Sequence, residues 1–392
     1  MRIALFKGDF RYDAVNHFTD ALAEAFSASG VKPMIVDMRS PREEIGAQLS
    51  AVCDADDLIA LFGFNALGSS IKVDGRTLHD ALSTPFVSYL LEHPLFHADA
   101  LTRLQDQPIL CVDGGHVRFM ESFSAPQAHL ALHAGATPPE YYAAPPWAER
   151  PNRVVFAGSF EPLSALRTRL AAVIAHDRSA ADAGIPPLND AFEALADELE
   201  SINDEDLADV AAMHPLTFAV QQFLGISAHY ATLLQCLILW RRAKLRHALL
   251  TQLDRDGLAV DLYGAGWNAA GFQNHRALGP LPFAELSKLL PTYRFTLNIS
   301  PLLGDGLHDR VVYGALSGTV VCTDENPQSK SLIAPGGALG YAPGDVGGLA
   351  DAINRLDKTA EGAAMAAMGR EIAMFDHTWA ARARKILNIL GR

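Results

Sequence analysis

The sequence predicts an α/β protein with two domains, each built on a parallel sheet, and a helical insertion in its second half. Short apolar runs alternate with helical periodicity through residues 1–150 and again from residue 258, and this rhythm is typical of βαβ units. A length of 392 residues suits two hydrophobic cores better than one. Residues 137–152 contain five prolines, which exclude a helix or a central strand and mark a boundary between domains.

The first 150 residues contain a regular succession of strands and helices. Each predicted strand is a short run of apolar and β-branched residues, and each predicted helix has apolar positions three or four residues apart. Strands are expected at 3–6, 33–36, 58–62, 85–90 and 109–112, and helices at 14–29, 45–52 and 78–82.

The second half begins with a predicted strand–turn unit at 153–160, with Gly158 and Ser159 at its end. Helical spacing then dominates up to residue 255, and part of it, about 180–240, is interpreted as a helical insertion. Within this stretch helices are expected at 165–176, 190–202, 207–213 and 217–253. Beyond it strands are expected at 259–263 and 338–341, and helices at 283–290, 346–356 and 359–374.

Residues 295–326 have the pattern of a strand, a glycine loop, a helix and a further strand. The pieces are the strand 295–299, the loop Gly304-Asp305-Gly306, the helix 307–317 stopped by Gly318, and the strand 319–323. Backbone N–H groups and the helix dipole favour an anion at such a helix start, above all a diphosphate. His308 and Arg310 add donors there. Many such units bind nothing, and the spacing is neither a P-loop nor G-x-G-x-x-G.

The composition indicates a globular protein whose partners are not nucleic acids. It has 45 acidic and 32 basic residues, and the net charge of −13 opposes binding to a polyanion. The first ten residues lack a signal-peptide core, and the apolar run 231–240 is about half a membrane span. The four cysteines are far apart, which favours buried thiols over a metal site or disulfides. These features predict a cytoplasmic protein with no metal centre and no membrane span.

A series of short motifs follows in order through residues 241–392. They are Tyr263-Gly264 with Trp267, Gly279 with Glu285-Leu286, Leu297-Asn298, His308 with Arg310, Gly318, and His377-Thr378-Trp379 with Arg382-Ala383. This order resembles the CgeB-like (spore-coat-type, glycosyl transferase group 1-like) family of glycosyltransferases. The resemblance extends more weakly to residues 156–159 and 85–94.

The resemblance implies the GT-B fold, in which two Rossmann-like domains face a cleft. Residues 1–150 would form the acceptor domain, 151–376 the donor domain, and 377–392 a helix crossing back to the first domain. The implied activity is hexosyl transfer from a nucleotide-diphosphate sugar, with no metal and no cofactor besides the donor substrate. The acceptor stays open among a protein, a glycan and a small molecule, and an oligomer is possible.

One departure from the wider fold family bears on mechanism. Many retaining GT-B enzymes carry an E-x7-E pair whose second glutamate holds the nucleotide ribose. Asp305 and Tyr313 occupy those positions here. Tyr313 cannot act as a carboxylate, so both the stereochemistry and the ribose contact stay open.

The candidate binding residues lie where strands end, because ligands of open α/β sheets bind beyond the carboxyl ends of strands. Backbone approach to the phosphates is assigned to Gly158 and Ser159, and the base or ribose to Tyr263, Gly264 and Trp267. The diphosphate is assigned to Ser300, Gly304, Gly306, His308 and Arg310, and hydroxyl groups to Asp324, Glu325 and Asn326; Asn298 and Tyr313 complete the set. Trp267 is equally well interpreted as a core-edge aromatic, and Arg310 as a surface cation.

An inverting transfer to an alcohol needs a general base from the first domain. Asp113 and His93 are the first candidates, followed by Asp13 and His116, since each follows a predicted strand. Two other functions stay open. One is a catalytically inactive GT-B protein that binds a nucleotide or sugar, suggested by Tyr313, and the other is a sugar-nucleotide epimerase of the same architecture.

Overall fold

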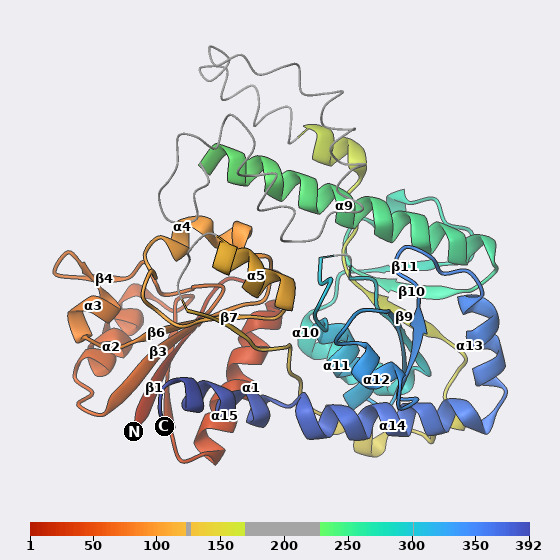
Figure 1. Cartoon of the computed structure of the whole chain (residues 1–392). Helices are drawn as coiled ribbons and strands as arrows, with labels where there is room; N and C mark the ends of the chain where they lie inside the picture. The colour runs from red at the N-terminus through yellow and green to blue at the C-terminus, as the bar shows by residue number, and fades with distance from the viewer. Residues whose placement is uncertain (123–126, 169–227, 301) are drawn as a thin grey trace, which may run out of the picture.

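The computed structural model describes residues 1–122, 127–168, 228–300 and 302–392 (Figure 1). Most of the expected helical insertion, including the helices predicted at 190–202 and 207–213, lies outside these residues. Two parallel six-stranded sheets confirm the predicted α/β class with two Rossmann-like units. The proposed domain limits themselves stay a prediction.

The first sheet has the strand order β2-β1-β3-β6-β7-β8, with all neighbours parallel. The central strands are buried on both faces, which explains why they are continuous apolar runs. The strands are β1 (Arg2–Lys7), β2 (Lys32–Asp37), β3 (Leu58–Phe64), β6 (Phe86–Leu90), β7 (Ile109–Cys111) and β8 (Ala128–Leu130), and β4 (Lys72–Val73) pairs with β5 (Arg76–Thr77). The helices are α1 (Ala14–Ala28), α2 (Arg42–Cys53), α3 (Leu78–Leu82), α4 (Ala98–Leu101) and α5 (Gly114–Ser122).

The second sheet has the order β11-β10-β9-β12-β13-β14 and is also parallel throughout. Its strands are β9 (Val154–Ala157), β10 (Val260–Tyr263), β11 (Arg276–Gly279), β12 (Phe295–Leu297), β13 (Val320–Asp324) and β14 (Ala338–Tyr341). The helices are α9 (Ala228–Arg255), α10 (Phe283–Leu289), α11 (Asp309–Leu316), α12 (Lys330–Ile333), α13 (Leu349–Asp357), α14 (Ala360–Asp376) and α15 (Trp379–Ile389). The strand order reverses direction between β9 and β12. Such a switch point opens a crevice at the carboxyl ends of the two strands.

Short 3-10 helices occupy several connections, including the proline-rich one. They are η1 (Arg11–Asp13), η2 (Pro94–His97), η3 (Pro139–Ala143), η4 (Trp147–Glu149), η7 (Trp267–Ala269) and η8 (Leu290–Thr292). The prolines therefore exclude an α-helix and a strand here, as expected, but still allow single tight turns.

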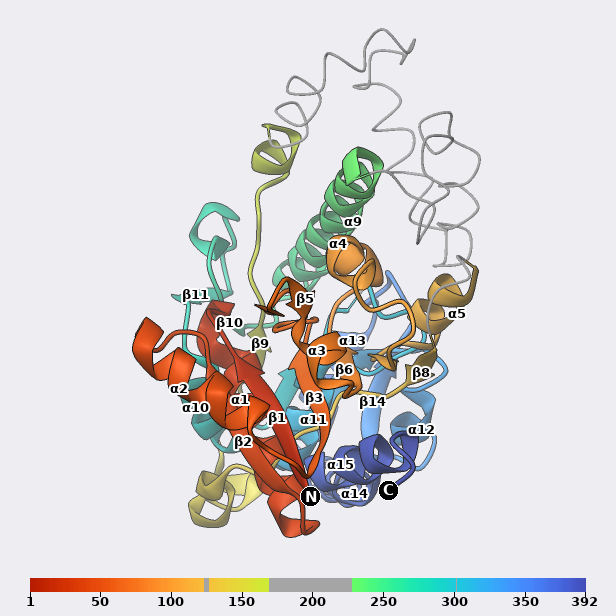
Figure 2. The same ribbon diagram turned by 90° about the vertical axis from the view of Figure 1, so that its left-hand side faces the viewer.

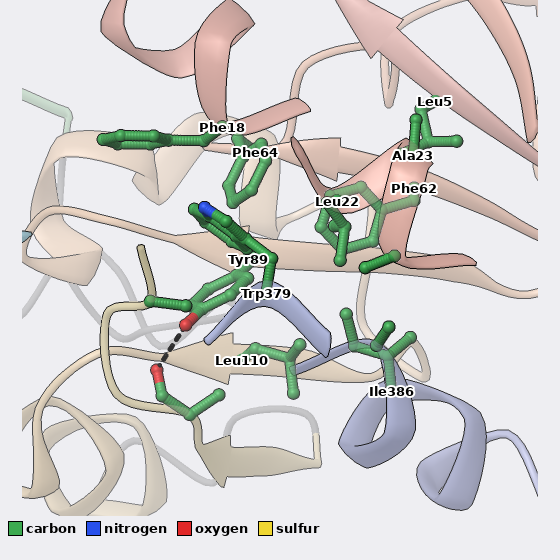
Figure 3. Close-up of a cluster of buried hydrophobic side chains, with 14 of the residues drawn as sticks. Leu5, Phe18, Leu22, Ala23, Phe62, Phe64, Tyr89, Leu110, Trp379 and Ile386 are labelled. Atoms are coloured by element: carbon green, nitrogen blue, oxygen red, sulfur yellow. Dashed lines mark hydrogen bonds between the residues drawn. The ribbon is translucent and has the colours of Figure 1, made fainter. Parts of the chain in front are cut away.

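The two domains share a buried aromatic cluster, defined here as Phe18, Phe64, Phe283, Tyr313 and Trp379. Ring centroids of Phe18 lie 5.0 Å from Phe283, 5.9 Å from Tyr313 and 5.4 Å from Trp379. Figure 3 shows Phe18, Phe64 and Trp379 packed together above Tyr89. Phe18 and Phe64 come from α1 and β3 of the first domain, whereas Phe283 and Tyr313 come from α10 and α11 of the second. The cluster therefore holds the two domains together.

Two helices cross between the domains. α15 packs beside α1 of the first domain, and the backbone of Gly135 donates to the carbonyl of His377 at 2.9 Å (Figure 1). α9 begins next to η2 and α4, as both views show, and ends in the second domain (Figure 2). Among the described residues, no helix combines the length and the apolar character needed to cross a bilayer.

Candidate functional site

Arg246 of α9 joins the ends of the two strands that flank the switch point. Its Nε donates to the carbonyl of Ile299 at 3.4 Å, beyond β12, and its Nη1 donates to the carbonyl of Ser159 at 3.3 Å, beyond β9. Arg310 of α11 lies beside it, and its Nη2 donates to the carbonyl of Ile299 at 3.4 Å and to Oγ of Ser300 at 3.2 Å. Both guanidinium groups lie over the ring of Phe156, with Cζ 5.6 Å and 4.9 Å from its centroid.

Neither arginine of this pair makes a direct ion pair among the described residues, although the carboxylate of Asp309 acts on both at longer range. Arg246 and Arg310 are only 7% and 6% exposed. Nε and Nη1 of Arg310 are buried and have no acceptor in the described part of the chain. Burial lowers the pKa of Arg310 to about 10, and burial with repulsion from Arg310 and Arg242 lowers the pKa of Arg246 well below its ordinary value. Two buried like charges are unfavourable without an anion beside them, and Asp309 supplies only one negative charge nearby, so the pair is a candidate anion site.

The start of α11 is partly occupied by its own side chains. Nδ1 of His308 accepts from the backbone N–H of Arg310 at 3.2 Å, and Oδ1 of Asp309 accepts from the same group at 2.8 Å. Burial lowers the pKa of His308 to about 3, so this imidazole is neutral. The anion is therefore expected at the arginine side chains, with the helix terminus in a lesser role.

Arg310 lines one pocket and Arg246 lines a second, while a third pocket is lined by Ile299 and Ser300, to which these arginines donate. The apolar pocket lies between the domains and includes Tyr12, Gly158, Tyr263, Gly264, Leu281, Phe283 and Arg310. The histidine pocket includes Glu92, His93, His116, Arg242, Arg246, Ser300 and His308. The carboxylate pocket includes Arg241, Ser300, Gly304, Asp324, Glu325, Asn326 and Tyr341. His308 lines both the apolar and the histidine pocket, and Ser300 lines both the histidine and the carboxylate pocket, so the three pockets adjoin one another.

The histidine pocket holds two of the four candidate bases. The rings of His93 and His116 are 4.8 Å apart, and Nε2 of His116 lies 3.2 Å from the carbonyl of Leu302. Glu92, at the end of β6, lines the same pocket, and burial raises the pKa of its carboxyl against the opposing effect of Arg242. An acid whose pKa is raised toward neutrality is suited to accept a proton.

Asp113 and Asp13 are engaged elsewhere. Oδ1 of Asp113 accepts from the backbone of Gly115 at 2.7 Å, and Oδ2 accepts from the backbone of Asp305 at 2.8 Å. Asp113 thus attaches the loop after β12 to the first domain. Oδ1 of Asp13 accepts from Nδ2 of Asn16 at 2.5 Å and from Arg39 at 3.0 Å, on a largely exposed turn. Their role as bases stays a prediction, although neither lines the histidine pocket.

Several predicted binding residues have clear structural contacts. Trp267 is buried, and its Nε1 donates to the carbonyl of Gly158 at 2.6 Å. Tyr313 is 1% exposed within the aromatic cluster, and its hydroxyl accepts from Nε1 of Trp379 at 3.3 Å. Gly306 packs on the first domain, where an added Cβ would lie 2.7 Å from the carbonyl of Val112.

Polar residues at the ends of β12 and β13 form one network. Nδ2 of Asn298 donates to Oγ1 of Thr323 at 2.9 Å and to Oδ1 of Asp324 at 3.2 Å. Burial raises the pKa of Asp324. The side chain of Asn326 donates to the carbonyls of Leu303 and Gly306. This network fixes the wall of the carboxylate pocket.

Sequence reasoning missed Arg242, Arg246 and Tyr12. A signal for the arginines was present, because Arg242 and Arg246 are four residues apart in a predicted helix and therefore share a face. Which face meets the cleft depends on the packing of α9, and the sequence does not give that packing. Tyr12 carries no comparable signal.

The chain is similar to glycosyltransferases in part of its sequence and in its fold. Residues 241–388 match the model of the family described as Glycosyl transferase-like, and no curated protein matches the chain. One similar solved structure is alpha-glucosyltransferase in complex with UDP, with 12% identity, a TM-score of 0.57 and 100% of both chains covered. The HepE protein of Anabaena in complex with UDP and glucose has 10% identity and a TM-score of 0.52, covering 100% of this chain and 99% of that one. At such identities the likeness shows a shared fold.

Proposed function

We propose that this chain, which has the GT-B fold and matches a glycosyl transferase-like family model over residues 241–388, transfers a sugar from a nucleoside-diphosphate sugar to an acceptor in the cleft between its domains. We also propose that the chain belongs to the CgeB-like subfamily and that it acts in the cytoplasm. The acceptor class stays open among proteins, glycans and small molecules.

The observation that carries this proposal is the pair of buried arginines at the switch point, which make no direct ion pair among the described residues. A diphosphate brings at least two negative charges, which match Arg246 and Arg310. The free Nε and Nη1 of Arg310 supply donors for its oxygens. The apolar pocket at one side suits the nucleoside, and the polar pockets at the other side suit the sugar and the acceptor.

The same residues account for departure of the leaving group. As the bond between the sugar and the diphosphate breaks, negative charge grows on the diphosphate, and the two guanidinium groups stabilise it. This supports a transfer that needs no metal ion. His93, His116 or Glu92 in the histidine pocket would receive the acceptor proton if configuration inverts.

The test is binding of UDP, GDP, ADP, CMP and dTDP, measured by thermal shift and then by calorimetry. UDP is the first choice because solved structures of this fold contain it. We expect one nucleotide to stabilise the wild-type protein. Arg246→Ala and Arg310→Ala should each weaken its binding by about 1.5–3 kcal/mol, the range for a charge-assisted hydrogen bond.

Arg355→Ala is the matched control, because Arg355 is an exposed arginine on α13 that pairs with Glu361. Its affinity should equal that of the wild-type protein. If both pocket variants bind the nucleotide as tightly as Arg355→Ala does, the arginine pair is not the diphosphate site.

Two alternatives predict different products. An inactive GT-B protein would bind the nucleotide but convert no donor with any acceptor, and the buried position of Tyr313 keeps this alternative in view. An epimerase would release a free sugar or an epimer without an acceptor. Mass spectrometry of the products, with and without an acceptor mixture, separates both from transfer.

A further inference from the structure

We propose that Tyr12, a residue of the first domain, completes the nucleotide site of the second domain. Its ring would form one wall around the nucleoside, and its hydroxyl group would hold the two domains closed. This inference rests on the proposed function, because it takes the apolar pocket as the nucleoside end of the donor site.

The hydroxyl of Tyr12 bridges the cleft to two loops at once. It lies 2.6 Å from Oγ of Ser159 and accepts from the backbone N–H of Ala265 at 3.2 Å. Ser159 follows β9 and Ala265 follows β10, so one first-domain side chain ties together two strand ends of the second sheet. Tyr12 also lines the apolar pocket, where it stands with Tyr263, Leu281 and Phe283.

The backbone at this turn is held in an unfavourable conformation. Tyr12 and Asp13 have φ values of 62° and 58°, in the left-handed region that residues with a Cβ rarely adopt. Such a turn persists only where surrounding contacts hold it. Those contacts are the two cross-cleft bonds of Tyr12, the bonds of Asp13 to Asn16 and Arg39, and the guanidinium of Arg11 over the Tyr12 ring at 5.0 Å. The shape of the turn is therefore coupled to closure of the cleft.

The position of Tyr12 assigns it to the nucleoside and not to the phosphates. Tyr12 bonds to the side chain of Ser159 and not to either arginine, and the arginines and their carbonyl partners all belong to the second domain, so a diphosphate can bind there without Tyr12. The apolar pocket, in contrast, takes its wall on one side from Tyr12 and Ala14 of the first domain. An aromatic ring at that wall can cover the base or the ribose.

The experiment compares two ligands in three variants. The ligands are inorganic pyrophosphate and whichever of UDP, GDP, ADP and dTDP the wild-type protein binds most tightly. Tyr12→Phe keeps the ring but removes the cross-cleft bonds, and it should bind the nucleotide about fivefold more weakly and release it faster. Tyr12→Ala removes the ring as well, and the loss should reach about 30-fold. Pyrophosphate affinity should change less than about twofold in both, since the arginines are intact.

Tyr142→Ala is the control, because Tyr142 is 76% exposed and does not line the apolar pocket. Nucleotide affinities of both Tyr12 variants equal to that of Tyr142→Ala would overturn the inference. An equal loss for nucleotide and pyrophosphate would also overturn it, since Tyr12 would then support the whole site. If the wild-type protein binds pyrophosphate but none of the four nucleotides, the proposed function fails, and this inference with it.

Discussion

One glycine marks the point where loops of the two domains meet. Gly306 pairs with Asp113 in an isolated antiparallel bridge, and a Cβ at this position would lie 2.7 Å from the carbonyl of Val112 and 2.8 Å from Oδ2 of Asp113. The first of these neighbours is backbone and cannot move aside alone. The glycine therefore sets how closely the loop after β12 approaches the first domain.

Gly306→Ala should destabilise the protein by about 1–3 kcal/mol, the usual cost of forcing an extra methyl group into a packed contact. Gly304→Ala is its control in the same loop, because a Cβ there would meet no atom within 4 Å. Urea denaturation of both variants measures the difference in free energy of unfolding. If the two variants have equal free energies of unfolding, the domains can separate slightly at this junction without loss of stability.

At the scale of elements, α15 is a helix of the C-terminal segment that completes the core of the first domain. Trp379 begins it, and Oγ1 of Thr378 caps it by accepting from the backbone of Ala381 at 3.3 Å. Arg382 donates to the carbonyls of Leu132 and His133 in the first domain. The helix is thus fixed by a cap, by polar bonds and by the ring of Trp379.

Trp379→Ala should lower the free energy of unfolding by about 3–5 kcal/mol, because it empties the centre of the aromatic cluster. Phe375→Ala, on the preceding helix, removes a ring that is 81% exposed and should cost much less. Chemical denaturation followed by far-UV circular dichroism compares them. If both variants lose a similar free energy of unfolding, the ring of Trp379 in the cluster stabilises the protein no more than an exposed ring does.

Elements with strong local signals were predicted well from the sequence. The strands at 58–62 and 338–341 and the helix at 78–82 are found as β3, β14 and α3. β8 and β11 were missed because both are edge strands; β11 is mostly exposed and β8 is half-buried, so neither shows an apolar run.

The site was predicted less completely than the fold. Arg310 and His308 were selected as candidates because they follow a glycine loop at a strand end, which is a local pattern. Arg246 reaches the same place from α9, and only the packing of that helix on the sheet brings it there. The spacing of Arg242 and Arg246 shows that they share one face of the helix, but the sequence does not give the surface that this face meets.

Across the whole molecule, folding keeps several histidines neutral. Burial lowers the pKa of His97, His133 and His377 to about 4 and that of His308 to about 3. Each folded pKa is lower than the unfolded value of about 6.5, so the unfolded chain binds more protons in acid. The stability linked to these groups is complete above about pH 6.5 and is lost as the pH falls toward 4.

Stability should therefore decrease from pH 7.5 to pH 5. His133→Gln removes one such group and should make the dependence shallower by about 1.4 kcal/mol per pH unit between pH 4 and 6.5. Urea denaturation of the wild-type protein and the variant at both pH values measures how much the free energy of unfolding changes with pH in each. The difference between the two proteins at pH 7.5, where the histidine is neutral in both states, gives any loss of packing separately. An unchanged slope would mean that folding does not lower the pKa of His133.

The placement of α15 also imposes an order on events at the ribosome. Leu22 and Phe26 of α1 are buried in one cluster with Ala383 and Ile386 of α15. More than half of the chain is synthesised between these two helices, at about 5–20 residues per second. During that interval the nascent first domain presents an uncovered apolar face to chaperones. Its final packing therefore waits for the last helix to emerge, and the chain matures as one unit instead of domain by domain.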